Sequence, residues 1–308
     1  MPTPPLWIVV LAAGAGTRLA SVTEGIPKQF WSIDGGPSLG EQTVERLGHL
    51  ATPERTLTVI NRCHERYVAR LAGAAALGRL IAQPCDRGTA TGIALALATL
   101  LESEPDAILL LTPSDHGVTC PRLFRKGVCE GVAAVRAGRV GIVLFGVEPD
   151  AAHDDYGWIA PRRAAQQRDR IQDVATFVEK PGPIEAARLL TAGAVWNTMV
   201  LVARASALFD LYRRFLPELA DALVPLSRVP ADRREAYLTE LYARLPSADF
   251  SSDVLSRAKE LAVYTWPASV GWSDLGTPER LARWLASDAQ SIDRRLSFSS
   301  QPVGTQVA

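Results

Sequence analysis

Small and basic residues meet in one loop near the start of the chain, in the stretch LAAGAGTRLASVTEGIPKQF from Leu11 to Phe30. Residues with little or no side chain, Ala12 to Gly16, follow an apolar run there, so backbone N–H groups can approach a bound phosphate. Arg18 and Lys28 can neutralise the charge of that phosphate. Taken alone, a glycine turn is also compatible with a purely structural turn or with a dinucleotide-binding site. A P-loop is excluded because no GK[ST] follows.

A carboxylate stands at the end of a second apolar run, DAILLLTPSDH, which predicts a buried strand that stops at Pro113. Ligands of an open parallel sheet bind outside the carboxyl ends of its strands. Asp115 is therefore well placed for Mg²⁺, which takes one or two carboxylates and fills its other positions with phosphate and water. An Asx turn is the structural alternative for an isolated Asp. His116 is expected to orient the loop rather than to act in catalysis.

The elements that must position these residues alternate along the chain. Apolar runs predict strands at 6–11, 55–60, 78–84, 106–113, 140–147, 196–203 and 260–266, with a strand pair at 156–161 and 173–181 around the polar loop 162–170. Helices are predicted at 39–50, 63–73, 89–101, 122–137, 184–191, 206–224 and 278–286, with a helical insert at 225–246. This order predicts an α/β protein with a mixed, mainly parallel sheet.

Composition limits the classes of function. The 308-residue chain carries 33 basic and 33 acidic residues, so no global field favours nucleic acid or an anionic membrane as a partner. No apolar run reaches the length of a membrane span, and the first one lacks the basic leader of a signal peptide. Four cysteines without paired spacing are expected to be reduced thiols in the cytoplasm. The oligomeric state stays open, a homodimer included.

The chain is expected to form one domain followed by a tail. Neither an internal repeat nor a linker-like change in composition interrupts residues 1–287, which are expected to fold as a single unit. Residues 288–308 are rich in Ser, Gln and Asp, and this composition predicts a loose C-terminal tail.

Motifs in a fixed order resemble those of the sugar-phosphate nucleotidylyltransferases. LAAGAGTRL…PKQF resembles the signature of that family, and PKQF with SLGEQTVERL resembles in particular the type II mannose-1-phosphate guanylyltransferases. The order continues with QPCDRGTATGIALA, LLLTPSDHGV, DDYGWI, FVEKP, WNTMVLV and GWSDLG. The resemblance covers roughly residues 6–281. It implies a Rossmann-like three-layer α/β sandwich of the nucleotide-diphospho-sugar transferase type.

The resemblance implies a nucleotide half and a metal site. Arg18 and Lys28 are the expected catalytic cations, and Asp115 with Asp274 of GWSDLG would hold Mg²⁺. The nucleotide is expected to contact Leu11, Ala12, Ala13, Gly14, Gly16, Thr17, Gln83, Arg87, Gly88 and Thr89. At the start of a helix, the last three of these also offer donors to a base carbonyl or a phosphate by their own chemistry. A plain N-cap is the alternative for Thr89.

The resemblance also implies a sugar-phosphate half. Its expected residues are Tyr156, Gly157, Glu179, Lys180 and Asn197. Glu179 and Asn197 supply acceptors for hydroxyl groups, and Lys180 supplies a cation for the phosphate. A Glu-Lys pair followed by Pro is also typical of an ordinary, solvent-exposed strand end, which is the structural alternative to a binding role.

Four positions depart from the family pattern. Gly88 stands where the family generally has Asn, and Thr91 stands where it generally has Pro. Thr198 and Met199 are bulkier than the residues that the family has after Asn197, so they are expected to narrow the sugar pocket. These departures leave the choice of base and sugar open.

The implied reaction joins a nucleoside triphosphate and a sugar 1-phosphate into a nucleotide-sugar and releases pyrophosphate. GTP and mannose 1-phosphate, giving GDP-mannose, are the expected substrates. The alternatives are the same reaction with another base or sugar, and a catalytically silent, nucleotide-sensing subunit. The latter is disfavoured because both catalytic cations, both metal carboxylates and Lys180 are present.

Overall fold

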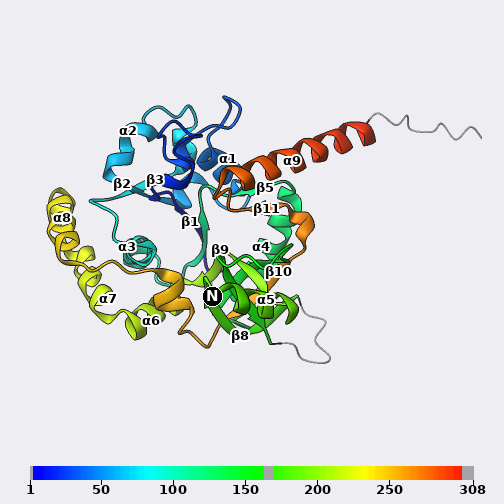
Figure 1. Cartoon of the computed structure of the whole chain (residues 1–308). Helices are drawn as coiled ribbons and strands as arrows, with labels where there is room; N and C mark the ends of the chain where they lie inside the picture. Colours follow the sequence, from blue (N-terminus) through cyan, green and yellow to red (C-terminus); the bar gives the residue numbers. More distant parts are fainter. Residues whose placement is uncertain (1–2, 163–169, 300–308) are drawn as a thin grey trace, which may run out of the picture.

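A mixed sheet forms the centre of the protein (Figure 1). The computed structural model describes residues 3–162 and 170–299. Within them the main sheet has the spatial order β3 (Arg79–Gln83), β2 (Thr56–Asn61), β1 (Leu6–Leu11), β4 (Ile108–Pro113), β9 (Val195–Arg204), β6 (Ile142–Val147), β10 (Ala262–Trp266), β8 (Ile171–Glu179) and β7 (Gly157–Pro161). Only β9 and β8 of these strands run against the others, which confirms the mixed, mainly parallel sheet. The polar loop predicted at 162–170 lies almost wholly outside the described residues.

Helices cover both faces of this sheet and make the two outer layers. Successive side chains of a strand point to opposite faces, so Val9 of β1 packs in one core cluster and Ile8 and Val10 pack in the other. The face of Val9 is covered by α3 (Thr89–Ser103), α6 (Ala205–Phe215), α7 (Pro217–Leu223) and α8 (Arg234–Arg244). The opposite face is covered by α1 (Leu39–Leu47), α2 (Glu65–Val68), α4 (Pro121–Arg136) and α5 (Pro183–Thr191). The three-layer sandwich is confirmed.

The carboxyl ends of four parallel strands meet at one edge. Leu11 of β1 lies opposite Val59 of β2 and Pro113 of β4, and Asn61 of β2 lies opposite Gln83 of β3. The loops that leave these strands therefore share one side of the sheet, where ligands of such sheets bind.

A small second sheet brings a distant segment to the same edge. After β4 the chain passes Asp115 and forms β5 (Gly117–Val118), which pairs antiparallel with β11 (Trp272–Ser273). Trp272 lies opposite Val118, and Ser273 lies opposite Gly117. The residue after β11 is Asp274, so this short pairing places the loops of the two aspartates beside each other.

Two predicted helices have other bounds than expected. The helix predicted at 206–224 is divided into α6 and α7, because Pro217 has no N–H to continue the hydrogen-bond ladder and Leu216 before it has a φ of −135°. The helix predicted at 63–73 is wrong in length, since α2 covers only Glu65–Val68 after the 3₁₀ turn Arg62–His64.

The last helix is longer than expected. The structure places α9 at Pro278–Ser299 (Figure 1), so the prediction that it ends at Ala286 was wrong. No Gly or Pro occurs between Ser287 and Ser299, so nothing in the backbone chemistry stops the helix there. Residues 288–299, assigned from composition to a loose tail, therefore continue α9, and the domain boundary at 287 remains a prediction. In the described part of the chain, no helix is long and apolar enough to cross a membrane.

Candidate active site

The opening loop is held by side-chain amides. Gln29 Nε2 donates to the carbonyls of Ala12 (2.8 Å) and Gly14 (2.9 Å), and Asn61 Nδ2 donates to the carbonyl of Ala13 (2.7 Å). In a trans peptide the N–H points away from its carbonyl. Since these carbonyls face Gln29 and Asn61, the N–H groups that follow them face the other way and can receive an anion.

Gly14 and Gly16 of the loop differ in whether the backbone leaves room for a side chain. Gly16 has a φ of +65°, and a Cβ at this position would lie 2.8 Å from the backbone nitrogen of Lys28. Gly14 has an ordinary φ, and a Cβ there would meet no atom within 4 Å. Gly16 is therefore needed by the fold, whereas Gly14 borders open space in the cleft described below.

Substituting these glycines should separate folding from nucleotide binding. We expect Gly16→Ala to lower the free energy of unfolding by about 2 kcal/mol, through left-handed strain and the clash with Lys28. Gly14→Ala should change it by less than about 0.5 kcal/mol and raise KM for the nucleotide by about tenfold, because a methyl group enters the cleft. Denaturant unfolding and initial-rate kinetics measure the two effects. An unchanged KM in Gly14→Ala would contradict the assigned phosphate loop.

A cleft of about 320 Å³ opens at this edge of the sheet. Residues predicted for the nucleotide and the metal line it together: Leu11, Ala13, Gly14, Gln83, Gly88, Thr89 and Asp115. Ala12, Gly16 and Thr17 belong to the same loop but do not line this cleft. The further lining residues, which were not predicted for the nucleotide, include the polar side chains Gln29, Asp86 and Asp249 as well as Met199.

The segment that follows the helical insert packs on the start of α3. Gly88 has a φ of +84°, and a Cβ there would lie 2.2 Å from the carbonyl oxygen of Ala248. Thr89 Oγ1 donates to Asp249 Oδ2 at 2.9 Å and accepts from the N–H of Phe250 at 2.8 Å. The close approach of this segment thus explains Gly88, where the resembled family generally has Asn.

Arg87 is turned away from this cleft. Its Nε donates to the carbonyl of Tyr242 at the end of α8 (2.8 Å), and it is not among the lining residues. The Tyr242 hydroxyl in turn donates to Gln83 Oε1 at 3.0 Å. The structure therefore brings Gln83, Gly88 and Thr89 to the cleft and leaves Arg87 with the insert.

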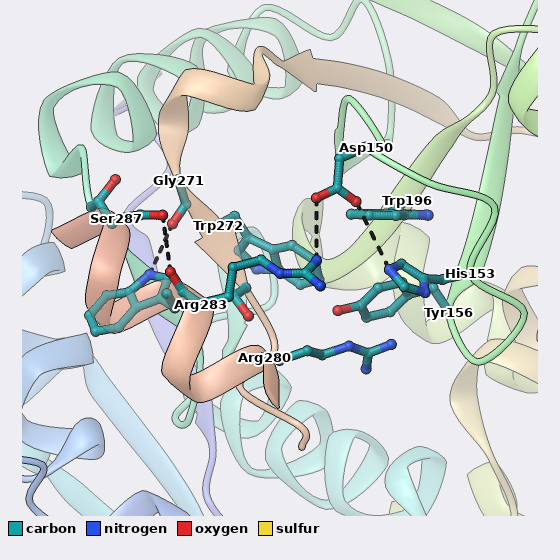
Figure 2. A pocket seen from close by; sticks show the side chains of 12 residues that line it. Asp150, His153, Tyr156, Trp196, Gly271, Trp272, Arg280, Arg283 and Ser287 are labelled. Carbon is teal, nitrogen blue, oxygen red and sulfur yellow. Dashed lines mark hydrogen bonds and ion pairs between the residues drawn. The ribbon is translucent and has the colours of Figure 1, made fainter. Parts of the chain in front are cut away.

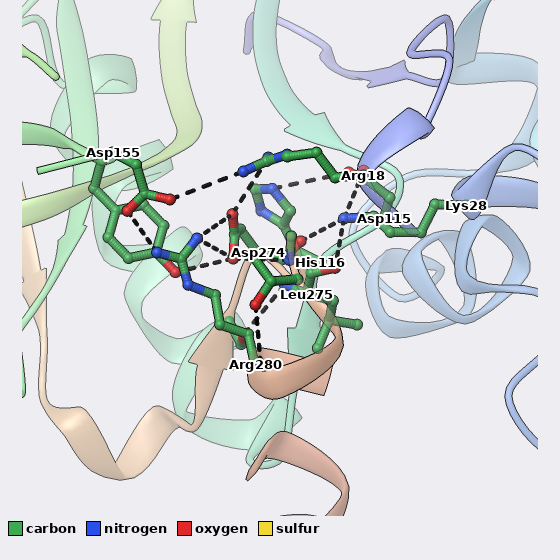
Figure 3. Close-up of polar contacts among 12 residues, drawn as sticks. Arg18, Lys28, Asp115, His116, Asp155, Asp274, Leu275 and Arg280 are labelled. Carbon is green, nitrogen blue, oxygen red and sulfur yellow. Dashed lines mark hydrogen bonds and ion pairs between the residues drawn. The ribbon is translucent and has the colours of Figure 1, made fainter. Parts of the chain in front are cut away.

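Cations and carboxylates form a cluster between the loop and the C-terminal segment (Figure 3). Lys28 Nζ lies 3.0 Å from Asp115 Oδ2 and donates to the backbone carbonyls of Asp274 and Leu275. Arg18 reaches Asp155 and Asp274 at 3.8 Å each, with a side chain that is 63% exposed. Lys28 is 6% exposed, so it is a buried cation, whereas Arg18 is a solvent-exposed one.

The charge state of Asp115 follows from this cluster. Burial raises the pKa of the Asp115 carboxyl, but the Lys28 ammonium beside it and His116 outweigh burial, and the net pKa lies below its usual value. Asp115 is therefore ionised at neutral pH, as a metal ligand must be.

Asp274 is held by partners from three segments. Its Oδ1 accepts from the Tyr156 hydroxyl at 2.9 Å and from the N–H of Gly276 at 3.0 Å. Its Oδ2 lies 3.1 Å from Arg280 in the first turn of α9. Arg280 also bonds Asp155 Oδ1 at 2.5 Å. Asp155 and Arg280 were missed from the sequence.

The donor set fits the predicted magnesium. The ammonium of Lys28 touches a carboxylate oxygen of Asp115 and the backbone of Asp274, so the two predicted ligands share one small neighbourhood. Two carboxylates suit Mg²⁺, which keeps water and phosphate oxygens in its other positions. No group of three or more His, Cys, Asp and Glu side chains that could hold a metal occurs among the described residues. Binding by Asp115 and Asp274 stays a prediction.

His116 supports the loop in its neutral form. Its Nδ1 accepts a hydrogen bond from Trp272 Nε1 at 3.2 Å, which links the end of β4 to β11. Burial lowers the pKa of His116 to about 4, an effect that the Asp115 carboxylate only partly opposes. A neutral imidazole that bonds an indole agrees with the expected orienting role.

His116 should make stability depend on pH. Its folded pKa is about 4 and the unfolded value is about 6.5, so between these values the unfolded chain binds more protons. Stability is then present above pH 6.5 and lost as the pH falls toward 4. Between pH 7 and pH 5, the free energy of unfolding should fall by about 2 kcal/mol less in His116→Gln than in the unmodified protein. Urea unfolding at both pH values measures this difference. Equal losses in both proteins would contradict this.

The residues predicted for the sugar phosphate gather beside β7 and β8. A Cβ on Gly157 would lie 2.6 Å from Glu179 Oε2 and 3.3 Å from the Cβ of Asn197, so these three residues adjoin. Burial raises the pKa of Glu179, and Lys180, whose Nζ lies 3.6 Å away, only partly opposes it. The Lys180 side chain is 67% exposed.

Thr198 does not narrow the sugar pocket. Its side chain is fully buried, and its hydroxyl donates to the Phe145 carbonyl at 2.6 Å inside the sheet. Met199 lines the nucleotide cleft instead. The expected narrowing by Thr198 was wrong because β9 turns that side chain into the core.

Tyr156 also borders a second hollow, beside α9 (Figure 2). Aromatic side chains dominate its lining, namely His153, Tyr156, Trp196, Trp272 and Trp284. The charged lining residues include Asp150, Arg280 and Arg283. Arg283 and Asp150 form an exposed ion pair of 3.7 Å across it. Tyr156 thus lines this hollow and also hydrogen-bonds Asp274, which is not among the lining residues.

The three-layer fold, with an anion-receiving loop, cations and paired carboxylates at one sheet edge, defines a nucleotide-binding α/β protein. The model of the nucleotidyl transferase family matches residues 8–291. The chain belongs to that family.

Known relatives are similar over most of the chain. Alginate biosynthesis protein AlgA of Pseudomonas putida is 30% identical over 276 residues, 87% of this chain and 56% of AlgA. Mannose-1-phosphate guanylyltransferase 2 of Escherichia coli O157:H7 is 28% identical, over 90% of this chain and 59% of its own. The chain thus spans little more than half the length of these relatives. A solved structure from Thermus thermophilus, named a mannose-1-phosphate geranyltransferase, has a TM-score of 0.79 at 30% identity, covering 91% of this chain and 79% of that one.

Proposed function

We propose that the protein transfers a guanylyl group from GTP to mannose 1-phosphate, giving GDP-mannose and pyrophosphate. The observation that carries this proposal is the convergence, at one sheet edge, of a phosphate-receiving loop, a buried Lys28, two carboxylates and the Gly157–Glu179–Asn197 group. The family match supports the reaction class. The relative named a mannose-1-phosphate guanylyltransferase supports the choice of base and sugar.

The reaction is an in-line displacement at the α-phosphorus. A phosphate oxygen of mannose 1-phosphate forms a bond to that phosphorus, and the bond to the bridging oxygen of pyrophosphate breaks. A phosphate monoester has a second pKa of roughly 6 and is largely ionised near neutral pH, so no general base is needed. The protein's task is to hold two anions together and to stabilise the developing charge.

Each charged residue has one part in this mechanism. Asp115 and Asp274 would hold Mg²⁺, which when bound neutralises charge on the α-phosphate. Lys28 keeps a positive charge fixed between the two aspartate loops. Arg18, on the exposed side of the cluster, would fold over the leaving pyrophosphate, and exposed Lys180 would hold the incoming phosphate.

The sugar would bind where Glu179 and Asn197 adjoin Gly157. A Cβ at Gly157 would have to displace the end of the Glu179 side chain, so the absence of a side chain leaves room for Glu179 and Asn197 side by side. Asn197 Oδ1 already accepts from the N–H of Met199 at 3.1 Å. A cytoplasmic location accords with the four free cysteines Cys63, Cys85, Cys120 and Cys129.

Pyrophosphate release tests the proposal. The purified chain is given Mg²⁺ and GTP with a panel of sugar 1-phosphates, and the panel is repeated with ATP, UTP, CTP and dTTP. Release with GTP and mannose 1-phosphate above all other pairs is the expected result. Release with another pair would keep the mechanism and overturn the base or sugar. No release from folded protein that binds GTP would favour a silent, nucleotide-sensing subunit.

A further inference from the structure

Tyr156 has a contact that its expected role in sugar binding does not explain. Its hydroxyl donates to Asp274 Oδ1 at 2.9 Å, between residues 118 positions apart in the chain. The residue is 8% exposed. A phenolic hydroxyl is protonated at neutral pH, so it serves as a donor to Asp274.

The partners of Asp274 differ between its two oxygens. Oδ1 accepts from the Tyr156 hydroxyl and from the N–H of Gly276, at 2.9 and 3.0 Å, and Arg280 Nη1 reaches it at 3.4 Å. A carboxylate offers about four lone-pair sites, two on each oxygen, so the two closer donors, Tyr156 and Gly276, fill those of Oδ1. The contacts of Oδ2 are with guanidinium groups, Arg280 at 3.1 Å and Arg18 at 3.8 Å (Figure 3). Since Arg18 comes from the nucleotide loop, Oδ2 is the oxygen on the side of that loop.

The Tyr156 ring cannot easily turn. It lies between Trp196, with ring centroids 4.7 Å apart, and the guanidinium of Arg280, 4.2 Å from the centroid of the tyrosine ring (Figure 2). Arg280 is in turn fixed by Asp155, the neighbour of Tyr156 in the chain. Packing and a cation–π contact thus hold the hydroxyl on Asp274.

We propose that Tyr156 is a positioning residue for Asp274: its hydroxyl occupies Oδ1, so that Oδ2 is the oxygen presented to a divalent cation. This inference rests on the proposed metal-dependent function. It assigns to the DDYGWI motif a part in the metal half of the site in addition to the sugar half. Groups that hydrogen-bond metal ligands typically change metal affinity by 10- to 100-fold when they are removed.

Titration with Mn²⁺ alone, followed by the electron paramagnetic resonance signal of the free ion, tests this role without turnover. We expect Tyr156→Phe to weaken Mn²⁺ binding by about tenfold. The phenylalanine keeps the ring packed between Trp196 and Arg280, and thermal unfolding checks that the variant is folded. Tyr237→Phe is the matched control, because its hydroxyl also donates a hydrogen bond of 2.9 Å, but to the Ala222 carbonyl in α7. It should bind Mn²⁺ like the unmodified protein.

The outcomes separate this inference from the proposed function. An Mn²⁺ affinity in Tyr156→Phe equal to that of the unmodified protein overturns the positioning role, whether or not KM for the sugar phosphate rises. Asp274→Asn is titrated in parallel. If that variant binds Mn²⁺ as tightly as the unmodified protein does, the metal site of the proposed function is itself wrong, and both ideas fall. Loss in Asp274→Asn without loss in Tyr156→Phe overturns the inference alone.

Discussion

Replacing Asp274 by Asn is expected to lower kcat by more than about 100-fold. Loss of a group that only hydrogen-bonds a metal ligand typically costs about 10- to 100-fold, so loss of the ligand's own charge should cost more. The amide keeps the shape of the side chain and can still accept from Gly276 and Tyr156, so the fold should persist. It loses the charge that a divalent cation needs, while Arg18 and Arg280 stay beside it. Initial rates as a function of Mg²⁺ concentration measure the effect, and EDTA should abolish the activity of the unmodified protein.

Asp232→Asn is the control for this substitution, because Asp232 is exposed in the insert. It should retain the rate and the Mg²⁺ dependence of the unmodified protein. A folded Asp274→Asn variant with normal Mg²⁺ dependence would refute a site built from two carboxylates.

Lys28→Ala is expected to lower turnover by about 100-fold, or about 2.7 kcal/mol of transition-state stabilisation. The structure adds a second effect. Lys28 is buried, and its ammonium is the cation nearest to Asp115 and a donor to the carbonyls of Asp274 and Leu275. Its removal leaves these acceptors without a charged donor, so the free energy of unfolding should also fall by about 1–3 kcal/mol.

The two effects of Lys28→Ala are measured separately, by rates at saturating substrates and by urea unfolding. Lys259→Ala is the control, since this lysine is exposed after the insert. Turnover within threefold of the unmodified protein, in a folded Lys28→Ala variant, would remove Lys28 from the catalytic groups.

Many strands and helices of the fold could be predicted because each is indicated by a short, continuous stretch of sequence. Uninterrupted apolar runs such as LWIVVL and AILLLT indicate buried strands wherever they occur, and β1 and β4 are indeed adjacent. The small residues after β1 and the carboxylate after β4 follow from the same rule, because strand ends collect at one edge. Asp274 could be expected only from the resemblance, since its place depends on the short pairing of β5 with β11.

The rest depends on contacts between distant parts of the chain. Arg280 is one of many basic residues, and nothing in the neighbouring sequence shows that it bonds Asp155 and Asp274. Asp249 lines the cleft only because the segment after the insert packs on the start of α3. The fully buried Thr198 could not be placed either, since the face of a strand on which a hydroxyl lies depends on register.

Lys28 and Asp274 are 246 positions apart in the chain, yet they touch. Closing so long a loop costs entropy that local contacts do not recover, and such contacts tend to form late in folding. During synthesis the phosphate loop and Asp115 leave the ribosome well before Asp274, β11 and α9 exist. A nascent chain can therefore form the loop after β1 early, whereas the contact between Lys28 and Asp274 forms only when the segment around β11 has docked.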